Sequence, residues 1–378
     1  MAYLADFKIL EEKKLGLSTP GKFGLLQGGR QKSDARRRKD MRAAVLRTPY
    51  NLKVEEVPRP EVKPGYVLVN VKSTAICGTD VGIYKGKIAA SLPRILGHES
   101  TGEVVEVGPE VTGLKPGDRV VLNSVIFCRH CPYCYTGQVN LCEHGGLMGR
   151  EVDGTFADYV AVPDFNAIKI PDCISYEDGT SLIALATVVR SQSRIKITPG
   201  ETVAVLGQGA AGLLQTRLAV LAGADPVFAI TRSQWKLDIA ARFGAQTINA
   251  RDVDPVAAVK EATGGRGVDI VIESVGSSAT LRQAMEMVRP GGTVVFFGIA
   301  PASLDDFYGY AMYYKELTLI GSRGMTPRDF ELAIKVVESG KIDLAPLISH
   351  RFDLSQVTEA LELVDKNPGE VLRVVVNI

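Results

Sequence analysis

Four cysteines lie within fifteen residues and form the most distinctive chemical pattern in the chain, Cys128-x-x-Cys131-x-x-Cys134-x7-Cys142. Tetrahedral zinc with four sulfur ligands needs ligands that are close in sequence on a chain that folds back, and this spacing supplies them. Four thiolates leave no coordination position open to a substrate. We therefore expect a structural zinc site that contributes folding energy. An iron–sulfur cluster and free thiols are the alternative interpretations.

A glycine-rich turn follows a short apolar strand and predicts a dinucleotide site. The expected strand Val203–Leu206 runs into Gly207-x-Gly209-x-x-Gly212 and then into an expected helix over 213–222. In this setting the first glycine permits a tight turn, the second admits a pyrophosphate, and the third lets helix and strand pack closely. The helix N-terminus offers free N–H groups to the anion. A purely structural turn is the alternative.

The end of the next expected strand indicates which cofactor is bound. An NAD-binding fold usually carries an acidic residue there, which bonds the ribose 2′-hydroxyl. Here the chain reads Ile230-Thr231-Arg232-Ser233, with Lys236 one helical turn further on. Hydroxyl and guanidinium donors suit a 2′-phosphate, so we expect NADP(H) rather than NAD(H). In either case Ser233 is expected to cap the following helix, and Arg232 as a solvated surface charge is the alternative.

These sites must be positioned by two kinds of element. From Met41 onward, short apolar runs separated by Pro-Gly turns are typical of a compact, barrel-like β domain. From residue 184, fully apolar strands alternate with helices, which predicts a parallel sheet covered on both faces. The expected strands are 203–206, 227–230, 269–272, 293–297 and 317–320, followed by a helix over 329–337 and a last strand over 371–376.

Composition excludes some classes of protein. Apolar residues make up 46% of the 378 residues, charged residues 23%, and the formal net charge is +1. No apolar stretch is long enough to span a membrane, and we expect a cytoplasmic protein. Residues 1–40 carry ten Lys/Arg and five Asp/Glu, a net of +5. We expect a mobile extension, or a start at Met41. A nucleic-acid-binding arm is the less favoured interpretation.

Taken with two further motifs, the sequence resembles the zinc-dependent medium-chain alcohol and polyol dehydrogenase family. The added motifs are Cys77-Gly-Thr-Asp80 and Gly97-His98-Glu99, and the resemblance runs over 41–378. It implies an α/β fold with a GroES-like, β-rich catalytic domain and a Rossmann domain with a doubly wound parallel sheet. The implied ranges are 41–183 for the catalytic domain, 184–324 for the NADP(H)-binding Rossmann domain, and 325–378 for the return to the catalytic domain.

The resemblance also implies a catalytic zinc site. Cys77 and His98 match the family's zinc ligands, and Glu99 matches a residue that binds zinc in the polyol-type members. At Ile183 the chain departs from the family, which carries a further ligand near this position. A branched alkyl group cannot bind a metal. One thiolate, one imidazole and one carboxylate still form an adequate open site, with water as the fourth ligand.

Three more residues receive roles from the resemblance. Thr79 matches the hydroxyl that takes the substrate proton, and Asp80 matches the carboxylate that orients the ligand histidine. Arg373 matches a basic residue that contacts the cofactor pyrophosphate. Gly82 stands where many members have the histidine that ends the proton relay. We therefore expect the proton to leave through water.

The function expected from these features is hydride transfer between nicotinamide C4 and the carbon of a primary or secondary alcohol. The enzyme is then a zinc-dependent, NADP(H)-linked alcohol dehydrogenase or carbonyl reductase. The alternatives are a zinc-independent NADPH-dependent reductase of enones or quinones, and a non-catalytic protein on the same scaffold. The expected partners are a small alcohol or carbonyl substrate and other copies of the chain, as a homodimer or homotetramer. Neither a membrane nor a nucleic acid is an expected partner.

Overall fold

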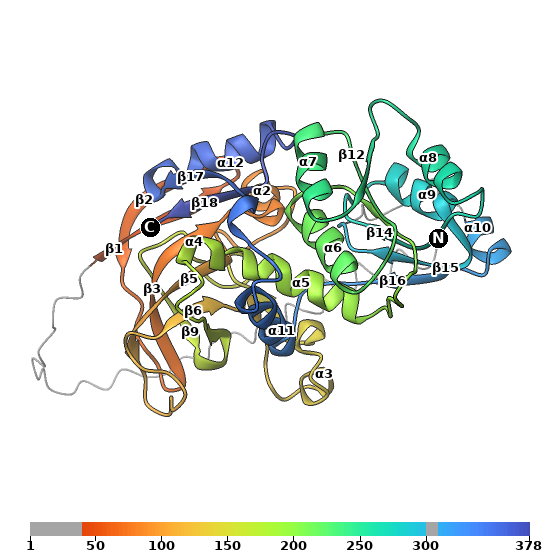
Figure 1. The fold of residues 1–378 in the computed structure, drawn as a ribbon. Helices are drawn as coiled ribbons and strands as arrows, with labels where there is room; N and C mark the ends of the chain where they lie inside the picture. Colours follow the sequence, from red (N-terminus) through yellow and green to blue (C-terminus); the bar gives the residue numbers. More distant parts are fainter. Residues whose placement is uncertain (1–39, 300–308) are drawn as a thin grey trace, which may run out of the picture. The chain divides into compact units, whose positions relative to one another are not determined.

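A computed structural model describes residues 40–299 and 309–378 (Figure 1). The expectations for the N-terminal extension fall on residues outside this range, apart from Asp40 at the start of the first strand. None of the helices within the described ranges has the length and apolar character needed to cross a bilayer.

The first part of the chain is β-rich, as predicted. A seven-stranded sheet has the order β10-β6-β5-β3-β18-β17, with β9 also paired to β3, and a three-stranded sheet has the order β2-β1-β4. Alternate residues of β3 point into one apolar cluster, among them Val67, Val69 and Val71. The strands are β1 (Asp40–Thr48), β2 (Asn51–Pro58), β3 (Tyr66–Ala75), β4 (Arg94–Ile95), β5 (Glu99–Val107), β6 (Arg119–Leu122), β9 (Tyr159–Pro163) and β10 (Ala167–Lys169), with the separate hairpin β7 (Val125–Ile126) and β8 (Gly146–Leu147).

The second part contains the predicted parallel sheet. Its six strands have the order β13-β12-β11-β14-β15-β16, the arrangement of a doubly wound dinucleotide-binding fold. The edge strand β13 was not predicted from the sequence, because half of its residues are exposed and it lacks a continuous apolar run. The strands are β11 (Val203–Leu206), β12 (Val227–Thr231), β13 (Gln246–Asn249), β14 (Val268–Glu273), β15 (Val288–Phe296) and β16 (Thr318–Gly321).

Helices cover both faces of this sheet, because alternate residues of a strand point to opposite faces. Ala204 and Phe228 pack in a cluster with residues of α8, α9 and α10. Val205 packs with Ala219 of α6, and Ala229 packs with residues of α5, α7 and α11. The helices of this part are α5 (Ser181–Ser193), α6 (Ala210–Leu221), α7 (Gln234–Arg242), α8 (Pro255–Ala262), α9 (Ser278–Met287), α10 (Gly309–Tyr314) and α11 (Pro327–Glu338).

The C-terminal segment joins the first sheet. Strand β17 (Ile348–Asp353) pairs with β18 (Arg373–Asn377), and β18 pairs antiparallel with β3. The expected domain limit at 183/184 lies inside α5, and α11, beyond the limit at 324/325, packs against α5. The remaining elements are α2 (Gly78–Tyr84), α3 (Pro132–Tyr135), α4 (Tyr176–Gly179), α12 (Val357–Lys366) and the short 3-10 helices η1 (Val139–Leu141), η2 (Asp164–Asn166), η3 (Ala345–Leu347) and η4 (Leu354–Gln356).

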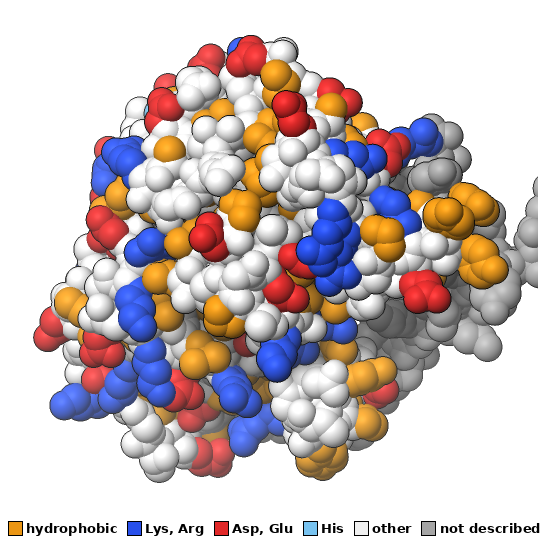
Figure 2. Space-filling model, turned by 45° about the vertical axis from the view of Figure 1, so that its right-hand side comes forward, with side chains coloured by type: hydrophobic (Ala, Val, Ile, Leu, Met, Phe, Trp, Pro, Cys, Tyr) orange, Lys and Arg blue, Asp and Glu red, His pale blue; other side chains and the backbone are white. Residues whose placement is uncertain are grey.

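Charges of both signs are mixed on the face shown in Figure 2. Lys and Arg side chains lie among Asp and Glu side chains, with hydrophobic groups between them. On this face the described residues therefore form no broad field of one sign, which is the feature that would attract a polyanion from a distance.

A buried carboxylate ties together the amino ends of the parallel strands. Asp269 Oδ1 accepts from Arg289 Nε at 2.6 Å, and Asp269 Oδ2 accepts from the Thr202 amide at 2.8 Å and from its hydroxyl at 2.7 Å. Burial opposes ionisation of this carboxyl. The bonds from Arg289 and Thr202 outweigh burial and lower the pKa of Asp269 to about 2.

We predict that Asp269→Asn lowers the free energy of unfolding by about 2 kcal/mol at pH 7. A carboxyl whose pKa is lowered in the folded state stabilises the fold above its unfolded pKa of about 4 and loses that effect as the pH falls through about 2. The difference between wild type and variant should therefore shrink as the pH falls below 4. Denaturant unfolding at several pH values measures it, with the exposed Asp252→Asn as control. A difference independent of pH would contradict this assignment.

Candidate active site and metal cluster

The residues around Cys77 and His98 are held by one carboxylate. Cys77 precedes α2 in an extended conformation, and its amide donates to Asp80 Oδ2 at 3.0 Å. Asp80 Oδ1 accepts from the Gly97 amide at 3.1 Å and lies 3.1 Å from His98 Nδ1. Asp80 is completely buried. This single side chain therefore fixes the start of α2 relative to the loop between β4 and β5.

The Asp80 contact also sets the charge state of His98. Burial lowers the pKa of His98, but the charge and hydrogen bond of Asp80, with a further contribution from Cys77, raise it well above 6.5. With Nδ1 as the donor to Asp80, Nε2 is the nitrogen left for a metal ion. A divalent cation must displace a proton from this cluster in order to bind.

Cys77, His98 and Glu99 converge on a common point. Each offers one ligand atom, and the three atoms lie within 4.8 Å of one another. His98 and Glu99 are buried, and Cys77 is half-buried. A thiolate, an imidazole and a carboxylate in this arrangement fit zinc at ligand distances of about 2.0–2.3 Å, with a position left for substrate or water. The assignment of these three residues as zinc ligands remains a prediction.

Arg373 lies beside this cluster and away from the cofactor cavity. Its Nη1 is 2.5 Å from Glu99 Oε2, and its Nη2 donates to the Thr180 carbonyl at 3.0 Å. Only 5% of Arg373 is exposed, and it does not line the cavity that contains Gly207. Contact with the cofactor pyrophosphate therefore remains a prediction, because the guanidinium pairs with Glu99.

Gly82 and Ile183, the two positions that depart from the family pattern, both lie among apolar side chains. At Gly82 an added Cβ would lie 2.6 Å from Ile88 Cδ1, so a larger side chain would require Ile88 to move. Ile183 is 1% exposed in an apolar cluster with Val121 and Ile174. Neither position offers a polar group. Thr79 is half-buried, and its hydroxyl accepts from the Cys77 thiol at 3.8 Å.

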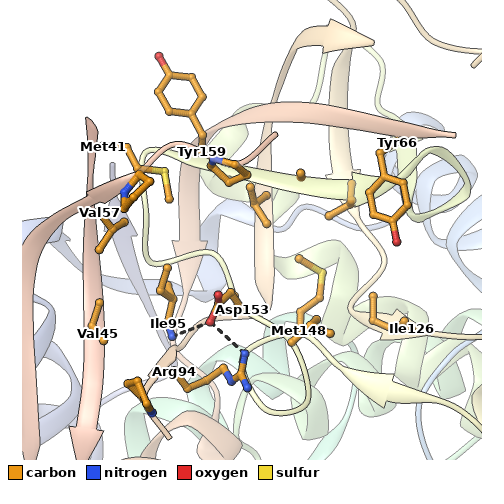
Figure 3. A pocket seen from close by; sticks show the side chains of 18 of the residues that line it. Met41, Val45, Val57, Tyr66, Arg94, Ile95, Ile126, Met148, Asp153 and Tyr159 are labelled. Atoms are coloured by element: carbon orange, nitrogen blue, oxygen red, sulfur yellow. Dashed lines mark hydrogen bonds and ion pairs between the residues drawn. The ribbon is translucent and has the colours of Figure 1, made fainter. Parts of the chain in front are cut away.

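The segment that leads from β4 to His98 is hydrogen-bonded to a second loop, which carries Asp153. Asp153 Oδ1 accepts from the Ile95 amide at 3.2 Å and from Arg94 Nη1 at 3.1 Å (Figure 3). Gly97 has φ +90°, and a Cβ there would lie 2.9 Å from the Phe156 amide nitrogen. Arg94, Ile95 and Asp153 line an apolar cavity of about 580 Å³ between β1, β2 and β9. None of Cys77, His98 and Glu99 lines this cavity, so it is separate from the cluster.

The four cysteines of the loop form a second cluster. Their sulfurs lie within 4.8 Å of one another, and the Cys128–Cys134 and Cys131–Cys142 sulfurs are 3.9 Å apart. Tetrahedral zinc with Zn–S bonds of about 2.3 Å requires sulfurs about 3.8 Å apart, so the set fits this metal. Local turns produce the arrangement, since Cys131 precedes the one-turn helix α3 and Cys134 lies within it.

Without a cation, Cys131 and Cys134 do not ionise together. Burial opposes ionisation of Cys131, but hydrogen bonds from the Glu143 and Cys134 amides lower the pKa of its thiol to about 6. Burial and the neighbouring Cys131 raise the pKa of Cys134 to about 12. A bound cation removes this conflict by stabilising every thiolate at once.

His130, inside the loop, is exposed, and its Nδ1 lies 2.7 Å from the Cys128 carbonyl oxygen.

A cavity of about 830 Å³ lies at the carboxyl ends of the parallel strands. Gly207 has φ +87°, and a Cβ on Gly212 would lie 1.8 Å from the Gly207 carbonyl oxygen. Space around Gly209 is open, so the backbone is free to approach a ligand there. The cavity lining includes Gly207, Gly209, Thr231, Arg232, Ser233, Lys236, Ser274, Thr280 and Pro368.

At the end of β12 one expectation is wrong. Ser233 occupies the N-cap position of α7 but makes no capping bond, and its hydroxyl donates to the Gly369 carbonyl at 3.3 Å. Lys236 Nζ donates to the Pro368 carbonyl at 2.9 Å, and burial lowers the pKa of this lysine. The loop before β18 accepts both bonds and forms one wall of the cavity. Arg232 is exposed at the cavity.

Sequence reasoning missed Glu273, which shapes the cavity. It is fully buried at the end of β14, and Oε1 accepts from the amides of Val275 at 2.8 Å and Gly276 at 2.9 Å. The same oxygen accepts from the Thr280 hydroxyl at 2.8 Å. These bonds order the turn that follows β14. The available signal was a charged residue directly after the apolar run 270–272.

Comparison with known proteins agrees with this geometry. Residues 63–172 match the alcohol dehydrogenase GroES-like domain family, and residues 210–339 match the zinc-binding dehydrogenase family. The protein named "Probable D-xylulose reductase A" from Neosartorya fischeri is 35% identical over 336 residues, which span 86% of this chain and 94% of that protein. L-threonine 3-dehydrogenase from Pyrococcus abyssi is 34% identical over 330 residues, covering 85% and 94%.

Solved structures show the same architecture. A zinc-binding dehydrogenase from Sinorhizobium meliloti 1021, bound to NADP, superposes with a TM-score of 0.84 at 34% identity, covering 90% of this chain and 100% of that one. An alcohol dehydrogenase from Thermus sp. ATN1 superposes with a TM-score of 0.82 at 35% identity, covering 89% and 99%. The GroES-like and Rossmann parts expected from the sequence are thus confirmed.

We predict that the two clusters respond differently to loss of one sulfur. Cys134→Ser should lose one zinc per chain and lower the melting temperature, because the loop depends on its metal for folding energy. Cys77→Ser should lose a different zinc and the activity while melting close to wild type. Elemental analysis, thermal unfolding and an alcohol oxidation assay on both variants check this. A wild-type protein with a single zinc, lost only in Cys134→Ser, would contradict a metal at Cys77.

Proposed function

The chain belongs to the zinc-dependent medium-chain dehydrogenase/reductase family, and from that premise we propose that it interconverts an alcohol and a carbonyl compound with NADP(H), using zinc at Cys77, His98 and Glu99. As a member, it is an NAD(P)-dependent oxidoreductase that acts on CH–OH groups. The observation that carries the proposal is the convergence of those three ligand atoms within 4.8 Å. The reaction moves a hydride between the carbinol carbon and nicotinamide C4.

The roles of the protein side chains follow from their contacts. Zinc, when bound there, supplies the Lewis acidity that polarises the substrate oxygen. Asp80 holds His98 through Nδ1 and keeps the opposite ring nitrogen directed at the cluster. Thr79 has its hydroxyl beside Cys77 and accepts the proton released by an alcohol. The Ile88 side chain occupies the space beside Gly82, so the proton passes from Thr79 to water.

Two other functions are possible on this scaffold. A zinc-independent reductase of C=C bonds or quinones needs no ligand set, and the absence of a metal donor at Ile183 is its best support. The buried positions of His98 and Glu99 beside Cys77 argue against it, since such a reductase gains nothing from three converging metal donors. A non-catalytic protein is disfavoured because the cofactor cavity retains its glycine turn.

We expect the purified protein to oxidise primary or secondary alcohols and to reduce the corresponding carbonyl compounds. Thr79→Val should lower kcat by about 10²–10⁴-fold, because the hydroxyl that relays the substrate proton to water is removed, while Thr79→Ser retains most of the activity. A panel of alcohols, carbonyl compounds and enones, assayed with metal-quantified protein, tests this. Reduction of enones alone, unaffected by Thr79→Val, would reject the proposal in favour of the zinc-independent reductase.

Preference for NADP(H) is supported by the end of β12. Thr231 and Arg232 line the cavity there, and no Asp or Glu is among the residues that line it. A carboxylate at this position would repel a 2′-phosphate, whereas a guanidinium binds it in a charge-assisted pair. Lys236 lines the same cavity, with its amine bonded to Pro368. Arg232 is therefore the principal determinant in this proposal.

We predict that Arg232→Gln raises KM for NADPH by about 10–100-fold, the effect of losing a hydrogen bond to a charged group. KM for NADH should change by less than about threefold, because NADH carries no 2′-phosphate. Steady-state kinetics with both cofactors measure the two effects. Arg242→Gln, an exposed arginine at the end of α7, is the control for a change in net charge. Equal effects on both cofactors would refute the role of Arg232.

Self-association is supported by the edge of the parallel sheet. Among the described strands β16 pairs only with β15, and the neighbouring α10 exposes aromatic groups, among them Tyr313 and Tyr314. An unpaired strand edge presents free N–H and C=O groups, which form a template for pairing with another chain. We propose that a second copy covers this edge. A monomeric mass in light scattering would exclude it.

A further inference from the structure

Three arginines line a pocket that belongs to neither metal cluster nor to the cofactor cavity. It has a volume of about 470 Å³. Arg190 and Arg194 lie one helical turn apart at the end of α5, and Arg323 follows β16. The rest of the lining is Gln138, Asn140, Leu141, Phe296, Gly321 and Ser322, without an acidic residue.

The charges in this pocket are not neutralised by the protein. Many arginines in the described part of the chain form an ion pair with a carboxylate. For example, Arg42 Nη2 lies 2.7 Å from Asp158 Oδ1. In the described part of the chain, neither Arg190 nor Arg323 makes an ion pair or a side-chain hydrogen bond. Arg194 donates to the Gly321 carbonyl, which leaves its charge unbalanced. A pocket lined by three guanidinium groups and no carboxylate concentrates anions from solution.

Three buried polar atoms of the lining lack a hydrogen-bond partner. Arg190 Nε and Ser322 Oγ can donate, whereas Asn140 Oδ1 is an acceptor. Buried polar groups are almost always paired in folded proteins, so an unpaired donor in a pocket points to a missing acceptor. One wall is held in place, since Asn140 Nδ2 donates to the Arg323 carbonyl at 2.9 Å and ties the cysteine loop to the segment after β16.

We propose that this pocket binds a phosphate group, either as free phosphate or as part of a phosphorylated small molecule. A phosphate dianion offers acceptors in several directions and matches three guanidinium groups better than a single carboxylate does. The site is distinct from the cofactor phosphate site, because the two cavities share no residue. Arg190 and Arg323 are its main determinants, since they approach from separate segments.

Titration of the full-length protein with inorganic phosphate at constant ionic strength tests the site directly. Wild type should bind phosphate at least tenfold more tightly than chloride, and Arg190→Gln and Arg323→Gln should each weaken binding about tenfold. The control Arg242→Gln should bind as wild type. Equal affinity for phosphate in all four proteins, or no preference over chloride, would overturn the proposal. Loss of zinc in Arg190→Gln would also overturn it, by assigning this arginine to the cysteine cluster.

A kinetic arm separates the two sources of phosphate, and only this arm rests on the proposed dehydrogenase activity. If the phosphate belongs to the substrate, a phosphorylated polyol should have a KM at least tenfold below that of the unphosphorylated polyol. Arg190→Gln should erase that difference. If free phosphate is the ligand, both polyols should share one KM, and inorganic phosphate should bind without competing with either. Phosphate binding without any oxidation of alcohols would retain the site and reject the proposed function.

Discussion

The arrangement of the candidate active site depends on one buried carboxylate, that of Asp80. A buried charge is tolerated only when it is paired and hydrogen-bonded. Here the amides of Cys77 and Gly97 and the ring of His98 meet this requirement together. The same bonds that stabilise Asp80 therefore join the start of α2 to the loop before β5. The proposed ligands Cys77 and His98 are thus positioned by their hydrogen bonds to Asp80.

The C-terminal strand completes this arrangement from the far end of the chain. Because β18 pairs with β3, Arg373 lies beside Glu99 and binds both that carboxylate and the Thr180 carbonyl before α5. An ion pair of this kind holds the Glu99 carboxylate in place beside the cluster. The pairing of β18 with β3 therefore matters for the proposed metal site, because the proposed ligand Glu99 is held by Arg373 from the last strand.

Helix α5 links the regions with separate chemistry. Its buried face carries Ile183 into the apolar core, while its last turn places Arg190 in the pocket beside the cysteine loop. The cofactor cavity lies on the parallel sheet and is closed by the loop before β18, through the bonds of Ser233 and Lys236. Binding at the cavity and the position of the C-terminal strand are thus physically connected.

The sequence by itself determined the features that depend on neighbouring residues. The four-cysteine loop, the glycine turn and the buried strands were predicted because their geometry is set by spacing along one short segment. Convergence of Cys77 with His98 and Glu99 was expected only through a family resemblance, since no local spacing brings them together. Tertiary structure alone decided the pairing of Arg373 with Glu99, the turn of Ser233 away from its helix cap, and the gathering of three arginines. Each of these joins segments distant in sequence, and such contacts are set by how whole elements pack rather than by the preferences of the residues that make them.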